Sequence, residues 1–136
     1  MISSAPSIHP KSSKHALVLA GGGSLGAVQT GMLMEICATG LRPDLIVGVS
    51  AGALNGAFLA YEFTPQMLER MAGLWARVRT RDILPLSWGS LLGLIGQRGH
   101  ISTGRGIRAL LERELPYRQF SQARVPLYIV AAEQQT

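Results

Sequence analysis

Residues 44–61, with the sequence DLIVGVSAGALNGAFLAY, decide the fold of this 136-residue chain. The run from Asp44 to Val49 is short and apolar, which is typical of a buried β-strand. The run after Ser50 is rich in small residues and predicts a helix packed close to its neighbours. Ser50 therefore lies at a sharp strand-to-helix turn inside the pattern Gly-x-Ser-x-Gly, which predicts a nucleophile elbow.

The elbow gives each residue of this pattern a physical role. Gly48 and Gly52 lack the side chains that would collide across so sharp a turn. The turn pushes the Ser50 Oγ out of the sheet, and the helix behind it offers unpaired N–H groups. The pattern alone is weak in a chain with 16 glycines, and an ordinary N-cap serine in a glycine-rich turn is the alternative.

A second glycine motif lies upstream, where the apolar run HALVLA of residues 15–20 ends in GGGSLG, residues 21–26. Free backbone N–H groups in such a loop bind anions. One interpretation is a dinucleotide loop, because the spacing G-x-G-x-x-G is met and Asp44 follows about twenty residues later. The other is an oxyanion hole. The elbow serine one β-α unit later favours the oxyanion hole, because neighbouring parallel strands bring both loops to one sheet edge.

The rest of the chain continues the alternation of strands and helices. A helix is expected from the glycine loop to Gly40, and another starts with Thr64 as N-cap and Pro65 at its first position. A last helix is expected from about Thr103 to Pro116, and a third buried strand from Pro126. Helical spacing places an apolar stripe on the second of these helices, at Met67, Leu68, Met71, Leu74, Trp75 and Val78. The sequence therefore predicts an α/β fold, three-layer α/β/α with a mainly parallel sheet, of which this chain supplies the opening strands.

Composition supports a globular protein, with 47% hydrophobic and 15% charged residues. The net charge of +5 favours acidic surfaces such as anionic lipid headgroups. The single cysteine, Cys37, is expected to be a small buried side chain and fits a reducing compartment. Residues 1–14 are expected to form a flexible tail, without the apolar run of a secretion signal. No run is apolar enough for a membrane span, so a cytoplasmic location is expected.

Three segments together resemble the first half of the patatin-like phospholipases. They are LVLAGGGSLGAVQTGML from residue 17, RPDLIVGVSAGALNGAFLA from residue 42 and PLYIVAAE from residue 126. The resemblance implies that residues 15–136 form the N-terminal part of such a domain. It implies a Ser–Asp dyad that cleaves lipid acyl esters through an acyl-enzyme, with Ser50 as the nucleophile. By position, the oxyanion hole would be formed by Gly21, Gly22, Gly23 and Gly26.

This chain departs from the family pattern in two places. Members often carry Arg or Lys just before the last loop glycine, where this chain has Leu25. The dyad Asp of the family lies in a downstream Asp-Gly-Gly or Asp-Gly-Ala motif, which the sequence does not reach before Thr136. Asp44 begins the strand that ends at Ser50, roughly 20 Å away at about 3.3 Å per residue. The expectation is therefore a fragment with little activity of its own.

Other side chains offer no better partner for Ser50. Asp82 lies in a basic stretch without pattern, and His100 is more simply a solvated loop residue than a base. His9 lies in the tail, and His15 begins the first strand at the edge opposite the glycine loop. No cluster of His, Cys or carboxylate has metal-ligand spacing, and no cofactor is expected.

The segment ILPLSWGSLLGLIG, residues 83–96, is apolar and bracketed by arginines, which fits peripheral contact with an anionic membrane. Core packing or a cover over an acyl pocket is the alternative. Nucleic-acid binding lacks support, because aromatics make up only 6% and no recognition motif is present. Two other functions stay open: a nucleotide-binding module that uses GGGSLG, and a non-catalytic remnant that binds lipid or a partner. The sequence does not predict an oligomeric state.

Overall fold

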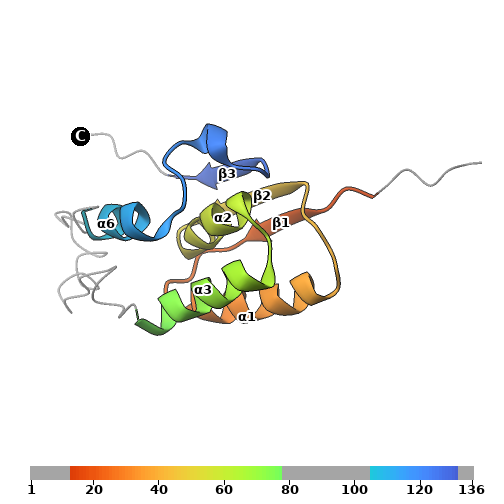
Figure 1. Cartoon of the computed structure of the whole chain (residues 1–136), viewed down its shortest axis with the longest axis horizontal. Helices are drawn as coiled ribbons and strands as arrows, with labels where there is room; N and C mark the ends of the chain where they lie inside the picture. The colour runs from red at the N-terminus through yellow and green to blue at the C-terminus, as the bar shows by residue number, and fades with distance from the viewer. Residues whose placement is uncertain (1–12, 78–104, 132–136) are drawn as a thin grey trace, which may run out of the picture.

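The structure is a computed structural model that describes residues 13–77 and 105–131 (Figure 1). Its sheet has three parallel strands in the order β1-β2-β3. The strands are β1 (Ala16–Leu19), β2 (Leu45–Val49) and β3 (Leu127–Val130). The helices are α1 (Leu25–Ala38), α2 (Ala51–Tyr61), α3 (Pro65–Arg77), α6 (Arg105–Glu114) and the short 3-10 helix η1 (Phe120–Gln122). The predicted α/β class and parallel sheet are confirmed.

The strand order explains why the described helices gather on one face of the sheet. Parallel connections are almost always right-handed, and here each new strand is added on the same side of the previous one. Both connections therefore cross the same face. Helix α2 packs on that face against all three strands, and α1 and α3 pack against each other and against α2 (Figure 1).

The core lies between the sheet and these helices. Its largest fully buried apolar side chains are Leu33, Ile46, Phe58, Leu59, Leu68 and Met71. Gly56 allows α2 to approach the sheet, because a Cβ atom there would lie 3.1 Å from Ile46 Cγ2 and 3.2 Å from Leu127 Cδ1. The predicted burial of Cys37 is confirmed, and its thiol is free. Helix α2 is thus the central packing element of the described chain.

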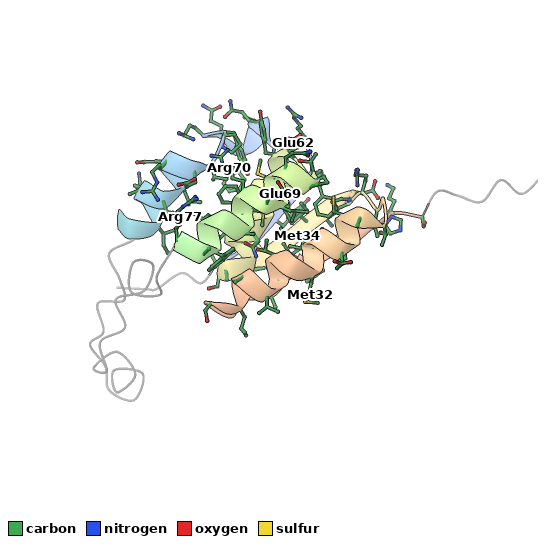
Figure 2. All side chains as sticks on the ribbon, turned by 60° about the horizontal axis from the view of Figure 1, so that its bottom comes forward. Met32, Met34, Glu62, Glu69, Arg70 and Arg77 are labelled. Atoms are coloured by element: carbon green, nitrogen blue, oxygen red, sulfur yellow. The ribbon has the colours of Figure 1, made fainter. Side chains whose placement is uncertain are left out.

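Helix ends agree with the predicted capping residues. The Met67 N–H donates to Thr64 Oγ1 at 3.3 Å, and Pro65 is the first residue of α3. Helix α6 ends at Glu114, two residues before Pro116, and β3 begins directly after Pro126. Arg70 lies on α3 (Figure 2). It joins α3 to α6, since its Nη2 donates to the Glu114 carbonyl at 2.6 Å.

The opposite face of the sheet is uncovered by the described residues. Val18, Val47 and Tyr128 are neighbours across the three strands and point to this face. Val18 is 76% exposed, Tyr128 63% and Val130 59%. On the outer side of α1, Met32 is 62% exposed (Figure 2). The described residues thus supply two layers, as expected of an incomplete three-layer fold.

Several sequence-based expectations lie outside the described residues. They concern most of the tail (1–12), the apolar segment 83–96, and the single residues His9, Val78, Asp82 and His100. Within the described ranges, no helix is both long and apolar enough to cross a membrane. The same residues hold no group of three His, Cys, Asp or Glu side chains placed to bind a metal ion.

Candidate active site

Ser50 occupies the turn between β2 and α2 with unusual backbone angles. Its φ is 52° and its ψ is −122°, and it is the one residue other than glycine with a positive φ in the part of the chain that the structure describes. Such a conformation costs about 1–3 kcal/mol in a residue with a side chain. Its carbonyl accepts the N–H groups of Ala53 at 2.9 Å and Leu54 at 3.1 Å, which anchors the first turn of α2. The strained serine is therefore bonded to the first turn of α2.

The two glycines around Ser50 are sterically required by this turn. A Cβ atom at Gly52 would lie 2.1 Å from the Leu19 carbonyl oxygen. A Cβ atom at Gly48 would lie 2.6 Å from the Gly52 carbonyl oxygen. Both distances are far below any normal contact. The backbones of β1 and of the first turn of α2 therefore leave no room for a side chain at either position.

The glycine loop lies directly beside Ser50. A Cβ atom at Gly21 would lie 3.2 Å from Ser50 Cβ. The loop closes as a turn in which Leu25 N–H donates to Gly22 O and Gly26 N–H donates to Gly23 O, both at 3.1 Å. Within the described residues, the N–H groups of Gly22 and Gly23 donate to no backbone or side-chain acceptor. These two N–H groups are therefore open donors of the loop.

Gly26 has a different environment from the other loop glycines. Its N–H is used inside the turn, and a Cβ atom there would lie 2.2 Å from Trp75 Cζ2. The absence of a side chain at Gly26 thus lets the indole of α3 pack on the first turn of α1. The sequence placed Gly26 among the oxyanion donors; its assignment there stays a prediction, and packing against Trp75 is a role that the sequence did not suggest.

A cavity of about 830 Å³ opens beside Ser50. Gly23, Ser24 and Ser50 line one part of it, and small side chains of α2 line another. Its apolar wall comes from Leu54, Ile107, Leu110, Leu111 and Leu115. This volume falls within the range of small-molecule sites, about 300–1,000 Å³. Ile107, Leu110 and Leu111 lie at helical spacing on α6, but this spacing alone does not predict that they line a cavity shared with Ser50.

The polar side chains around Ser50 do not complete a catalytic pair in the described ranges. The hydrogen bonds found there join no side chain to Ser50 Oγ. Glu112 lines the same cavity from α6, a position the sequence gave no reason to single out. Asp44 accepts the His15 N–H at 2.8 Å at the opposite end of the strands, as its place before β2 predicted. Leu25, which stands where the family often has a cation, is 62% exposed.

Tyr117 lines the cavity and bonds to α2. Its hydroxyl donates to the Ala57 carbonyl at 2.8 Å, and burial raises its pKa. Its ring stacks on Tyr61, with 5.8 Å between centroids. This contact holds the segment after α6 against the helix that begins at Ser50.

A serine on a strained strand-to-helix turn, beside a glycine loop with open N–H groups, defines the elbow class of α/β proteins. A family model of patatin-like phospholipases matches residues 17–131. The chain therefore belongs to the patatin-like phospholipase family.

Curated relatives agree with this family. The chain is 28% identical to patatin-like phospholipase domain-containing protein 7 of Rattus norvegicus over 118 residues, covering 87% of this chain and 8% of that protein. It is 40% identical to neuropathy target esterase sws of Drosophila melanogaster over 70 residues, covering 52% of this chain and 5% of that protein. The chain thus spans less than a tenth of the length of these relatives. No solved structure matches. These matches do not favour the nucleotide-binding alternative.

Proposed function

We propose that this chain carries the nucleophile and oxyanion half of a lipid acyl hydrolase site. The observation that carries the proposal is the strained Ser50 at an apolar cavity, beside the open N–H groups of Gly22 and Gly23. Family membership supports a hydrolase that acts on lipids. The apolar wall from α2 and α6 fits the hydrocarbon part of an acyl ester.

The proposed reaction is an acyl transfer in two steps. Ser50 Oγ attacks the ester carbonyl carbon, and the carbonyl oxygen takes the negative charge and accepts the loop N–H groups. The C–O bond to the alcohol breaks, the alcohol leaves with a proton, and water then hydrolyses the acyl-enzyme. The base that removes the Ser50 proton would be the Asp of the family's Asp-Gly-Gly-type motif. Because the described part of this chain gives Ser50 Oγ no such partner, we expect slow hydrolysis by the 136 residues alone.

Covalent labelling tests the role of Ser50. Incubation with a decyl fluorophosphonate should give a single adduct on Ser50, found by peptide mass spectrometry, and decanoate should slow its formation by filling the cavity. Ser50→Ala should abolish the adduct. Ser24→Ala, which changes another serine lining the same cavity, should keep it.

Two results would contradict this role. An adduct that survives Ser50→Ala would place the nucleophile elsewhere. A folded protein that binds decanoate but stays unlabelled after long incubation would support the non-catalytic, lipid-binding remnant. Cytoplasmic location and contact with anionic membranes stay predictions; binding to vesicles containing phosphatidylserine, lost at high salt, would support the membrane contact.

A further inference from the structure

Asn55 is a buried polar residue in the core of the site. It lies on α2, one and a half turns after Ser50, and is 1% exposed. Its Nδ2 donates to the Gly26 carbonyl at 3.0 Å and to Gln29 Oε1 at 2.9 Å. Its Oδ1 accepts the Trp75 indole N–H at 2.9 Å. One amide therefore joins α1, α2 and α3.

This network fastens the glycine loop at both ends. Gln29 Nε2 donates to the carbonyl of Ala20, which directly precedes the loop, at 3.3 Å. The carbonyl of Gly26, the last residue of the loop, accepts a hydrogen bond from Asn55 Nδ2. Because Asn55 also bonds to Gln29, the two flanks of the loop connect through a single side chain on the helix that starts at the nucleophile.

We propose that Asn55 is a positioning residue that fixes the loop N–H groups relative to Ser50; the inference rests on the function proposed above. Oxyanion donors act only when they lie about 2.7–3.1 Å from the developing charge. A shift of about 1 Å in such a site can cost about 100-fold in rate. A leucine of similar volume would fill the same space on α2, but it would leave the loop and the elbow without a direct bond between them.

Thr30 offers a matched control. It is the other buried polar side chain in the described ranges, also 1% exposed, and its Oγ1 donates to the same Gly26 carbonyl at 2.9 Å. This bond lies within α1 and joins no second element. Thr30→Val therefore removes a buried hydrogen bond to the same oxygen without releasing the loop from α2.

The first test measures binding of decylboronic acid to the full chain. In the adduct, Ser50 Oγ bonds to boron, the serine proton goes to solvent, and boron becomes a tetrahedral anion beside the loop, visible by ¹¹B NMR. We expect Asn55→Leu to weaken this adduct by about tenfold or more. Binding of decanoate, which needs only the cavity, should change less than twofold. Thr30→Val should leave both affinities within twofold.

The second test does not depend on the chemistry of Ser50. ¹⁵N relaxation of the Gly22 and Gly23 amides should report faster, wider motion in Asn55→Leu and ordinary order in Thr30→Val. Gln29→Met, a substitution at a half-buried position that is less disruptive to folding, should mobilise the same amides by releasing Ala20.

The outcomes separate the two proposals. If the wild-type chain forms no tetrahedral boron species while the amides loosen in Asn55→Leu, the nucleophile role of Ser50 fails and the loop-fastening role of Asn55 stands. If the adduct forms and Asn55→Leu, folded by circular dichroism, changes neither its affinity nor the order of the loop amides, the inference is overturned. Equal weakening by Thr30→Val would also overturn it, because loss of any buried hydrogen bond would then suffice.

Discussion

At the scale of single residues, the backbone of Ser50 stores strain that a plain turn would avoid. In the described residues, Ser24 and Ser50 both stand at helix N-caps, but Ser24 has a φ of −62°, whereas Ser50 has a φ of 52°. Glycine occupies positive φ at little cost, so evolution of a turn for stability alone would place glycine at position 50. A serine at this strained position supports the proposed role of its hydroxyl.

Ser50→Gly should therefore stabilise the fold while removing the proposed nucleophile. We expect the free energy of unfolding to rise by about 1 kcal/mol, because relief of the strained φ exceeds the loss of a side chain that is exposed. Urea denaturation monitored by circular dichroism measures it. Ser24→Gly is the control and should lower stability slightly, since its φ suits any residue and glycine adds disorder to the unfolded chain.

The sequence predicted the sharp turn formed by Ser50, Gly48 and Gly52. It could not predict the hydrogen bond between Asn55 and Trp75. The Gly-x-Ser-x-Gly pattern is local, so its geometry follows from one strand, one turn and one helix. The bonds of Asn55 depend on how α3 crosses α1, because Trp75 is twenty residues away in sequence. The sequence offered one signal, an Asn within a run of small apolar residues. Because Asn55 is buried, its side chain needs hydrogen-bond partners inside the protein.

At the scale of elements, the position of the turn at Ser50 depends on how closely α2 packs against β1. Gly52 lies against the Leu19 and Ala20 carbonyls with no room for a methyl group. At Gly31, on α1, no described atom beyond the nearby backbone of its own helix lies within 4 Å of the position that a Cβ would take. Packing therefore requires glycine at position 52, whereas position 31 has room for a larger side chain.

Gly52→Ala should lower the free energy of unfolding by about 1–3 kcal/mol or prevent folding, because α2 must move away from β1. Gly31→Ala should raise it by up to about 1 kcal/mol through helix propensity alone. Thermal denaturation of both variants against the wild type gives the comparison. Equal effects of the two substitutions would mean that α2 does not contact the strand as closely as the Cβ geometry indicates.

Tyr117 should make the free energy of unfolding fall at alkaline pH. Burial raises its pKa above the unfolded value of 10.0, so the folded state keeps the phenol proton longer than the unfolded state. Its contribution is complete below pH 10 and is lost as the pH rises from there through the folded pKa, with a slope of at most about 1.4 kcal/mol per pH unit.

Tyr117→Phe should remove this component of the pH dependence. It should also cost about 1 kcal/mol at neutral pH, because the Ala57 carbonyl loses a hydrogen bond while the stacking on Tyr61 is kept. Denaturation curves between pH 8 and 11 test both effects. A variant with the same alkaline loss of stability as the wild type would assign that loss to other groups.

At the scale of the whole molecule, one face of the sheet carries all the packing of the described helices. The row Val18, Val47 and Tyr128 belongs to the other face and remains largely open. Alternating strands and helices predicted the α/β class and the parallel sheet. They could not predict which face is covered, because that follows from the strand order and the hand of the connections.

The open face should bind the apolar dye ANS under native conditions. Val18→Lys combined with Tyr128→Lys should reduce the dye fluorescence by about twofold, since it breaks the apolar row. Ala38→Lys combined with Gln66→Lys adds the same charge at exposed positions elsewhere and is the control. A similar decrease in both variants would attribute the effect to charge and not to the sheet face.

The contact between Trp75 and Gly26 also makes Trp75 an intrinsic fluorescent probe of the site. The indole donates to a buried amide, rests on the backbone of α1 and lines the cavity beside Ser50. Its emission is therefore sensitive both to release of the loop and to a hydrocarbon chain entering the cavity. With Trp88 replaced by phenylalanine, Trp75 would be the single tryptophan, placed where the glycine loop, α2 and the cavity meet. Ligand entry could then be followed in real time without any added label.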